Sequence, residues 1–411
     1  MNVGLPQQID VVVIGAGQAG LATSRELSDA GVDHLVLEKG RVAETWRRRW
    51  DSFCLVTPNW TLQLPGHPYD GDDPDGFMPR DEVVAYLVRY AGKAGAPVRE
   101  GVEVRSLSPD ASGGFQLETS DGAMAARAVV VSTGAYQRAH RPLAAAALPA
   151  DLLQMDADHY RNPEDLPDGP VLIVGSGQTG CQIAEELHHA GRAVFLSCGR
   201  APWLPRRLGD RDAVWWALET GFFDAALSTL PTPAARLGAN AQMTGHDGGR
   251  DLHYRTLRRA GVTLLGHFTG VDGHTARFAP DLGESVAWGD ERNGELMDSV
   301  REHAAEQGVP PPEIHEPEPF DGSAPEELDL RAVGAVIFAG GYRPAYESWI
   351  DCPGAFDELG FPVHDEGAST ASPGLYFVGV HFLRKRKSAL LLGVGEDAAI
   401  VARQVAASIL R

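Results

Sequence analysis

Short apolar runs alternate with stretches of helical periodicity at the start of the chain. Residues 11–14 form a β-branched run that is typical of a strand buried on both faces, and the apolar spacing over 21–30 predicts a helix. A second strand is predicted at 34–37, which completes a unit of strand, helix and strand. Because the same order of elements recurs over 171–196, the pattern predicts an α/β protein with two βαβ units.

Further elements are predicted on both sides of the second unit. The expected strands lie at 128–132, 335–342 and 374–380, and the expected helices at 81–92, 178–190, 284–307 and 395–410. Residues 51–80 are rich in proline, glycine and aspartate with interleaved aromatic residues, which indicates an ordered excursion rather than a regular element. The acidic, proline-rich segment 310–328 is predicted to be an exposed loop.

The composition narrows the class of protein. A chain of 411 residues with 43% apolar and 22% charged residues is globular and long enough for two or three domains. Its net charge of −20 argues against nucleic acid or an anionic membrane as a partner, because such a chain repels phosphate. The cysteines and histidines lack the spacing of metal or dithiol sites, so we expect no metal. The short apolar runs and the absence of a signal-peptide pattern lead us to expect a cytoplasmic protein, by default a homodimer.

Each βαβ unit carries a glycine-rich turn of the form G-x-G-x-x-G, with GAGQAG at 15–20 and GSGQTG at 175–180. Between a strand and a helix, this spacing lets the backbone approach a pyrophosphate, which the N–H groups of the helix N-terminus bind. Glu38 follows the second strand of the first unit, where its carboxylate can bond a ribose hydroxyl. A tight turn without a ligand is the alternative, and the presence of Glu38 favours a dinucleotide site.

The second unit differs at the position of that acid. Ser197 stands at the strand end, and Arg200, Arg206 and Arg207 follow. A carboxylate would repel a 2′-phosphate whereas arginines attract it, so the second site is predicted to prefer NADPH, with a solvated arginine surface as the alternative. One site suited to FAD and one suited to NADPH together predict hydride transfer from nicotinamide to flavin.

The order of several motifs resembles the class B flavin-dependent monooxygenases, especially bacterial members akin to the plant YUCCA enzymes. The motifs are GAGQAG, EKG, ETWRRRW, VVVSTGAY, GSGQTG, GRAPWLPRR, FAGGYRP, GLYFVGV and RKSALLLGVGEDAA. The block RWDSFCLVTPNWTLQLPGHPYDGDDPDGFM is also similar to flavoproteins encoded in nitrilase-containing gene clusters.

The resemblance implies two Rossmann-like dinucleotide-binding domains, with an NADPH domain (150–329) inserted into an FAD domain (1–145 and 330–411). It also implies that NADPH reduces the flavin, that oxygen forms a C4a-hydroperoxide, and that one oxygen atom passes to nitrogen or sulfur of a small soluble metabolite. The alternatives are an NADPH oxidase or flavin reductase, oxygenation of a carbonyl, and a redox-sensing flavoprotein that uses the 310–328 segment for docking.

The resemblance assigns residues to the two cofactors by position. The FAD set is Gly15, Gly17, Gln18, Ala19, Gly20, Glu38, Lys39, Trp46, Arg47, Val104, Thr133, Gly134, Gly340, Gly341, Tyr342, Gly379, Lys387 and Ser388. The NADPH set is Gly175, Ser176, Gly177, Gln178, Thr179, Gly180, Ser197, Arg200, Arg206 and Arg207. The basic run 384–387 is expected to anchor the flavin edge or an acidic substrate, with a solvated loop as the alternative.

The sequence departs from the family pattern at three places. Gly340 replaces the threonine of the usual ATGY motif, and Arg138 stands where the Baeyer–Villiger fingerprint F-x-G-x-x-x-H requires histidine, which disfavours carbonyl insertion. An asparagine or histidine beside the flavin in many relatives aligns with Val56. Either Asn59, together with Thr57, takes that catalytic role, or the stabilisation of the hydroperoxide differs.

Overall fold

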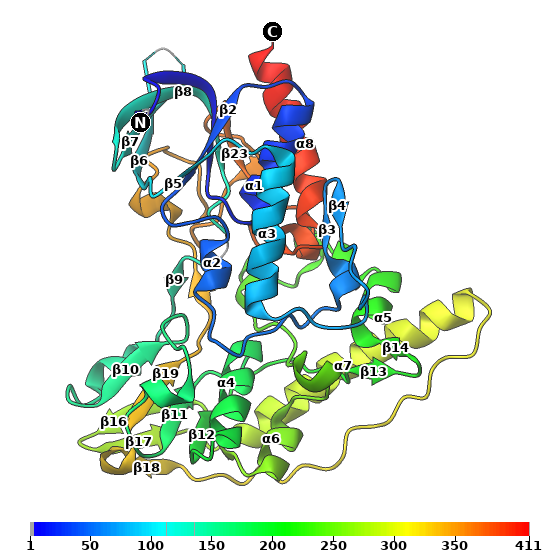
Figure 1. Ribbon diagram of the computed structural model, residues 1–411. Coiled ribbons are helices and arrows are strands. Elements are labelled where there is room, and N and C mark those ends of the chain that lie inside the picture. The colour runs from blue at the N-terminus through cyan, green and yellow to red at the C-terminus, as the bar shows by residue number, and fades with distance from the viewer. Residues whose placement is uncertain (1–3, 112, 135, 411) are drawn as a thin grey trace.

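The computed structural model describes residues 4–111, 113–134 and 136–410. Its framework is two β sheets with parallel central strands, which lie one above the other in Figure 1. The larger sheet has the path β21-β22-β23-β8-β1-β2-β5. Its strands are β21 (His364–Asp365), β22 (Ala368–Ser369), β23 (Leu375–Phe377), β8 (Gly122–Val131), β1 (Gln8–Ile14), β2 (His34–Glu38) and β5 (Val98–Glu100). An antiparallel hairpin of β6 (Val104–Pro109) and β7 (Phe115–Thr119) extends from β8.

The smaller sheet has the order β10-β19-β11-β12-β15, and all its strands are parallel. They are β10 (Leu153–Asp156), β19 (Ala335–Phe338), β11 (Val171–Val174), β12 (Val194–Ser197) and β15 (Thr263–Leu265). The chain therefore leaves the larger sheet after β8, forms the smaller sheet, and returns to the larger sheet at β21. A small antiparallel sheet of β16 (Phe268–Asp272), β17 (Thr275–Phe278) and β18 (Glu327–Asp329) packs beside the smaller sheet.

Helices cover the sheets where their apolar stripes require burial. Three of them, α1 (Gln18–Asp29), α3 (Arg80–Ala94) and α8 (Val394–Ile409), lie side by side against the larger sheet (Figure 1). The smaller sheet is accompanied by α4 (Gln178–His189), α6 (Tyr254–Ala260) and the long α7 (Leu282–Glu306). The side chains of Leu21 and Leu27 in α1 are fully buried, as are Val11 to Val13 in β1, so burial on both faces of the strand is confirmed.

Two short strands join the upper and lower parts of the molecule. They are β9 (Arg138–Ala139) and β20 (Tyr342–Arg343), which pair antiparallel. Other short elements are α2 (Glu44–Arg47), β3 (Gln63–Leu64), β4 (His67–Pro68), β13 (Arg207–Leu208), β14 (Arg211–Asp212) and α5 (Ala213–Glu219). None of the helices in the described part of the chain is long and apolar enough to cross a membrane.

The predicted helices and strands lie within a few residues of those observed, but the strands β10 and β15 to β18 are not predicted, and one loop differs. The strand β10 is not predicted because its sequence, LQMD, is short and half polar, as suits the edge of a sheet. The segment 310–328 is irregular and mostly exposed until β18, yet its Phe320 side chain is half-buried and the guanidinium of Arg258 lies over its ring at 4.2 Å. The loop is thus packed along α6 rather than free over its whole length.

Candidate functional site

The first glycine turn leaves open space at its middle glycine. Gly15 has a φ of +105°, and a Cβ there would lie 2.7 Å from the carbonyl oxygen of Ser132. A Cβ on Gly20 would lie 1.8 Å from the carbonyl oxygen of Gly15, so both positions require glycine. A Cβ on Gly17 would have no heavy atom within 4 Å, so the backbone of Gly17 is accessible at the N-terminus of α1. This is the arrangement that a pyrophosphate needs.

The carboxylate of Glu38 is attached to this turn. Glu38 ends β2 and is 8% exposed, and its Oε2 accepts a hydrogen bond from Ala16 N at 2.8 Å. Its Oε1 accepts a second bond from Gly40 N at 2.8 Å, whereas the neighbouring Lys39 is exposed. The acid predicted to bind a ribose thus stands beside the glycine backbone that would hold the phosphates.

The segment after β2 reaches back to α1. Trp46 in α2 donates from Nε1 to Gln18 Oε1 at 2.9 Å, and Arg47 Nε donates to Val42 O at 3.0 Å. The indole therefore orients the first side chain of the glycine-turn helix. Both Trp46 and Gln18 were assigned to FAD by resemblance, and the structure brings them together.

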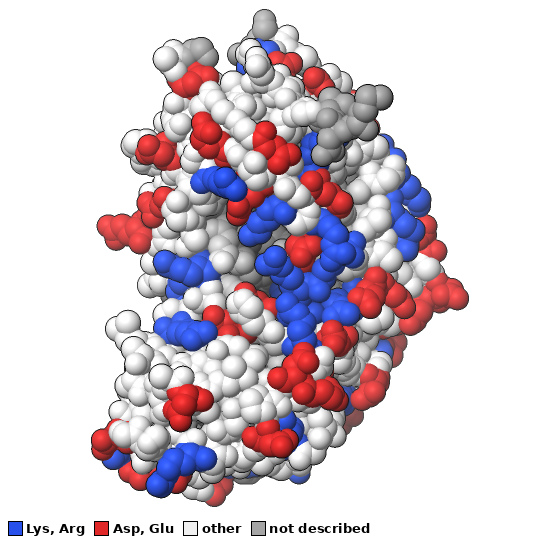
Figure 2. All heavy atoms as spheres, turned by 60° about the vertical axis from the view of Figure 1, so that its left-hand side comes forward, with Lys and Arg blue, Asp and Glu red and all other residues white. Residues whose placement is uncertain are grey.

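Arginine side chains gather where the chain leaves α2. Arg161 Nη1 donates to Arg48 O at 2.6 Å, and Arg80 Nη1 donates to Arg49 O at 3.1 Å. Figure 2 shows basic side chains around a hollow at the middle of the face that it presents, between the upper and lower parts of the molecule. Carboxylates pair with Arg48 and Arg80, so part of this positive charge is compensated within the chain, and the rest suits anionic groups of a cofactor.

Other members of the FAD set have structural roles as well. Gly379 follows β23 with a φ of +78°, and a Cβ there would lie 2.6 Å from the Cβ of Ala19, so the strand end packs against the first turn of α1. Val104 begins β6 and is half-buried in the hairpin beside the larger sheet. Contacts of both residues with a cofactor stay predictions.

The second glycine turn repeats the backbone geometry of the first. Gly175 has a φ of +109°, and a Cβ there would lie 2.6 Å from the carbonyl of Ala339. A Cβ on Gly180 would lie 2.0 Å from Gly175 O. The middle glycine differs, because a Cβ on Gly177 would meet the Ala239 methyl at 3.3 Å. A segment near residue 239 therefore lies over the second turn.

Polar side chains of the second turn are used to hold this segment and the end of β12. Ser176 Oγ lies 2.6 Å from the hydroxyl of Tyr254 and accepts a bond from Gly199 N at 2.8 Å. Gln178 Nε2 donates to Ala241 O at 3.0 Å. Both side chains therefore support the shape of the turn, and the backbone N–H groups of the turn are the donors that could contact a phosphate.

The end of β12 presents one free cation among the residues that the structure describes. Ser197 is buried, and its hydroxyl donates to Gly266 O at 2.9 Å, which turns it away from a ligand. Arg200 is exposed three residues later and has no ion-pair partner within the described ranges. Thr179, in the first turn of α4, is half-buried.

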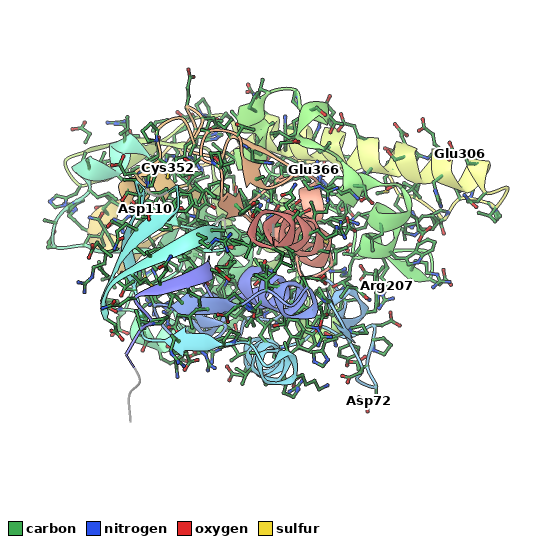
Figure 3. All side chains as sticks on the ribbon, turned by 90° about the horizontal axis from the view of Figure 1, so that it is seen from above. Asp72, Asp110, Arg207, Glu306, Cys352 and Glu366 are labelled. Carbon is green, nitrogen blue, oxygen red and sulfur yellow. The ribbon has the colours of Figure 1, made fainter. Side chains whose placement is uncertain are left out.

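The predictions for Arg206 and Arg207 do not fit their placement. Arg206 is 3% exposed, pairs with Asp212, and donates from Nη1 to Val56 O at 2.8 Å. Arg207 is exposed in β13, which lies apart from β12 in Figure 1, and Figure 3 shows it near the outer edge of the molecule. Arg206 is buried against Asp212, and Arg207 lies apart from β12. We therefore do not expect either to bind the same phosphate as Arg200.

The amide of Asn59, predicted to be catalytic, forms hydrogen bonds within the protein. Asn59 is 5% exposed, and its Nδ2 donates to Asp73 O at 2.9 Å while its Oδ1 accepts from Met78 N at 2.8 Å. These bonds connect the first part of the 51–80 excursion to its last part. The Thr57 hydroxyl lies 3.0 Å from that of Thr61. The structure therefore gives Asn59 a structural role, while the catalytic roles of Asn59 and Thr57 stay predictions.

The linkers between the upper and lower parts are built from glycine. Gly134 and Gly341 have φ values of +82° and +77°. A Cβ on Gly340 would lie 2.6 Å from His140 O, which explains why this chain has no threonine there. Thr133 Oγ1 accepts a bond from Gln137 Nε2 at 3.3 Å. These positions serve the crossing of the chain, and their cofactor contacts stay predictions.

An aromatic cluster forms beside the linkers. Tyr136 lies edge-on to Tyr342 and to His381, with ring centroids 5.2 Å apart in each pair, and the Arg49 guanidinium lies over Tyr136 at 5.4 Å. Burial lowers the pKa of His381 to about 4, so the imidazole is neutral at neutral pH. Distant segments supply these residues, and no spacing in the sequence joins them. The motifs FAGGYRP, VVVSTGAY and ETWRRRW contain Tyr342, Tyr136 and Arg49, whereas His381 lies in none of them, and only Tyr342 is assigned to a cofactor.

The basic run 384–387 is neither a solvated loop nor a set of free anchors. Lys385 Nζ contacts Asp224 and Glu396 at 2.6 and 3.1 Å, and Lys387 Nζ contacts the same two carboxylates at 3.1 and 2.5 Å. The carboxylates neutralise both lysines, so neither is a free cation in the described structure, and a contact of Lys387 with the flavin edge stays a prediction.

The remaining members of the run are engaged too. Arg384 Nη1 contacts the buried carboxylate of Asp397 at 3.0 Å, and Ser388 Oγ accepts from Arg384 N at 3.1 Å. The Arg386 guanidinium lies over the ring of Phe222 at 4.1 Å. Because Phe222 and Asp224 follow α5, this cluster ties the start of α8 to the part of the chain that forms the smaller sheet.

Comparison with known proteins places the chain in a family. The pyridine nucleotide-disulphide oxidoreductase family matches residues 12–211. A protein of Geobacillus kaustophilus (strain HTA426), named an uncharacterized CzcO-like oxidoreductase, is 30% identical over 393 residues, with 95% of this chain and 96% of the relative covered. The rice (Oryza sativa subsp. japonica) indole-3-pyruvate monooxygenase YUCCA4 is 28% identical over 428 residues, with 94% and 85% covered. The chain belongs to the class B flavin-dependent monooxygenases.

The monooxygenase also shares its fold with a solved relative. The flavin-containing monooxygenase of Stenotrophomonas maltophilia aligns with a TM-score of 0.68 and 22% identity, covering 98% of this chain and 99% of that one. The monooxygenase is thus a flavin-dependent oxidoreductase, and its family implies a flavin and a nicotinamide nucleotide as cofactors. The chain offers two glycine turns for these two nucleotides.

Substitution of two glycines in the first turn separates packing from cofactor binding in this monooxygenase. Gly17→Ala adds a methyl group in open space, so we expect a folded protein that loses bound flavin because the methyl obstructs the pyrophosphate. Its flavin-free form should unfold at the same temperature as the flavin-free native protein. Gly20→Ala is expected to lower the unfolding temperature as well, since its methyl meets Gly15 O. The flavin-to-protein ratio and the unfolding temperature check both. A Gly17→Ala protein with a full complement of flavin would contradict this assignment.

The low pKa of His381 predicts an acid-dependent loss of stability. The imidazole has a pKa of about 4 in the folded state against 6.5 ordinarily, so between these values the unfolded chain binds more protons. Stability is therefore expected to fall as the pH drops from about 6.5 towards about 4. The His381→Gln variant should show a smaller fall than the native protein when unfolding temperatures are compared across this range. An equal fall in both proteins would rule out the contribution of His381.

Proposed function

We propose that this monooxygenase contains FAD, takes hydride from NADPH, and transfers one atom of molecular oxygen to nitrogen or sulfur of a small soluble metabolite. In this proposal, residues 1–145 and 330–411 bind FAD, and residues 150–329 form an inserted domain that binds NADPH. The observation that carries it is the contrast between two matching glycine turns. One has a buried carboxylate at Glu38, and the other has the exposed cation of Arg200.

The residues present fit the two cofactors. The open backbone at Gly17 and the N-terminus of α1 suit the pyrophosphate of FAD, and the Glu38 carboxylate stands where it could accept a bond from a ribose hydroxyl. When bound, the dinucleotides would supply hydride transfer and activation of oxygen. The chain has to hold both cofactors, keep water out and orient the substrate.

The choice of NADPH over NADH rests on Arg200. Ser197 offers no carboxylate that would repel a 2′-phosphate, and Arg200 follows it closely with an unpaired guanidinium in the described structure. Arg206 and Arg207 do not contribute, for the reasons of burial and distance given above. A single arginine thus carries the predicted specificity.

Nitrogen or sulfur is preferred to carbonyl carbon as the site of oxygenation. Arg138 stands where the Baeyer–Villiger fingerprint requires histidine, and it is an exposed residue of the linker strand β9. An open hollow of about 360 Å³ lies between the 51–80 excursion and residues 245–248, and it could admit a small metabolite. Cys54, Phe77 and His246 are among the residues that line it.

An NADPH oxidase is the second candidate, and one observation favours it. Both polar atoms of the Asn59 amide are held by the excursion, and the aligned position 56 carries the apolar side chain of valine. Val56 has no side-chain donor, and the amide of Asn59 keeps at most one of its two N–H donors. The oxidase would release peroxide in place of an oxygenated product.

The Arg200→Ala variant tests the cofactor assignment. Loss of charge-assisted bonds to the 2′-phosphate is expected to reduce the ratio of kcat/KM for NADPH to that for NADH by about tenfold or more. Anaerobic rates of flavin reduction at varied NADPH and NADH provide the measurement. Arg259→Ala is the matched control, because Arg259 is an exposed arginine on α6, and it should leave the ratio unchanged. An unchanged ratio in Arg200→Ala would remove Arg200 from the NADPH site.

A further inference from the structure

Arg206 differs from the arginines around it in being almost fully buried. It is 3% exposed, whereas the side chain of Arg211 in the hairpin that follows is 56% exposed. A buried guanidinium is costly unless charges and acceptors surround it. The partners of Arg206 therefore show what the fold gains by burying it.

On one side, the guanidinium holds the 51–80 excursion. Its Nη1 donates to Val56 O at 2.8 Å, and its central carbon lies 4.8 Å from the centroid of the Phe77 ring. Phe77 also lines the open hollow between the excursion and residues 245–248. One side chain thus contacts both the start of the excursion and the wall of this hollow.

On the other side, Arg206 is fixed to the chain that follows β12. Asp212, which is 6% exposed, pairs with its guanidinium, and Arg206 N donates to Asp251 Oδ1 at 2.6 Å. Gly249 has a φ of +84°, and a Cβ there would lie 2.8 Å from Arg206 Cδ. A glycine is required at this position so that the backbone can close over the arginine.

The excursion is also connected to the first glycine turn. Trp46, bonded to Gln18, has its ring centroid 5.8 Å from that of Phe53, three residues before Val56. Arg206 reaches the same stretch from the segment that follows Ser197. The bond between Arg206 and Val56 therefore connects the surroundings of the two glycine turns.

We propose that Arg206 is a positioning residue: by holding the carbonyl of Val56 it fixes residues 55–57 relative to the smaller sheet, and so sets the geometry in which the two cofactor sites face each other. The fixed position of residues 55–57 does not depend on the proposed function, whereas the effect on the geometry of the two cofactor sites rests on it. It replaces the expectation that Arg206 binds the 2′-phosphate, because the guanidinium is paired with Asp212 and closed off from the surface.

The test compares Arg206→Lys, Arg206→Met and Asp212→Asn with Arg211→Met, an exposed arginine of the same hairpin, as the control. Hydrogen exchange of the peptides that cover residues 53–62 is the first readout, and it needs no substrate. We expect exchange in these peptides to become several-fold faster in the Arg206 and Asp212 variants and to stay unchanged in Arg211→Met. Lysine keeps the charge but cannot hold Val56 and Asp212 together in the same planar geometry, so Arg206→Lys tests the proposal if the methionine variant fails to fold.

The second readout is catalytic. Misplacement of residues 55–57 is expected to slow anaerobic reduction of the flavin by NADPH about tenfold and to raise the fraction of NADPH electrons recovered as peroxide, while the preference for NADPH over NADH is retained. Unchanged exchange at 53–62 would overturn the positioning role. A loss of NADPH preference in the Arg206 variants would restore the phosphate role instead. If the native protein fails to oxidise NADPH, the proposed function fails, and the exchange experiment still decides the role of Arg206.

Discussion

The fold depends on how closely a helix can approach the end of a strand in each parallel sheet. At both glycine turns, a methyl group at the third glycine would overlap the carbonyl oxygen of the first, at 1.8 Å in one turn and 2.0 Å in the other. Only backbone fits, so the N–H groups of α1 and α4 are presented directly at the strand ends. Everything that distinguishes the two sites is then decided by what surrounds these turns: open space and a carboxylate at the first, and a covering segment and an arginine at the second.

The second constraint is the connection between the two sheets. The two linker strands are short, and further contacts join the two parts. An apolar cluster packs Val56 against Leu204 and Trp216, Arg206 donates to Val56 O, and Lys385 and Lys387 pair with Asp224. Hydrogen bonds and ion pairs require particular distances and directions, so they add a geometric constraint to the apolar packing between the two parts. In the proposed function such control matters, because hydride would pass from C4 of the nicotinamide to N5 of the flavin, and the two cofactors would be held by different parts of the chain.

Much of this arrangement could be predicted from local patterns in the sequence. The βαβ units, the glycine turns and the position of Glu38 depend on residues close together in the chain, and the structure places them as expected. Arg206 and Arg207 are adjacent and chemically identical, yet one is buried and the other is exposed. The difference depends on contacts of Arg206 with Val56 and Phe77, which lie far earlier in the chain. The same holds for the neutralised lysines near α8 and for the cluster of Tyr136, His381 and Arg49, whose members meet only in the folded chain.

We expect the flavin of this chain to be held so that oxygen is transferred to a substrate rather than released as peroxide. The most direct test is to reduce the purified protein anaerobically with NADPH, mix it with oxygen in a stopped-flow instrument, and follow the flavin spectrum together with peroxide. A monooxygenase should show a spectrally distinct species that persists before the oxidised flavin returns, with peroxide appearing only as that species decays. Direct return of oxidised flavin, accompanied from the start by an equivalent amount of peroxide, would contradict this expectation and identify the protein as an oxidase.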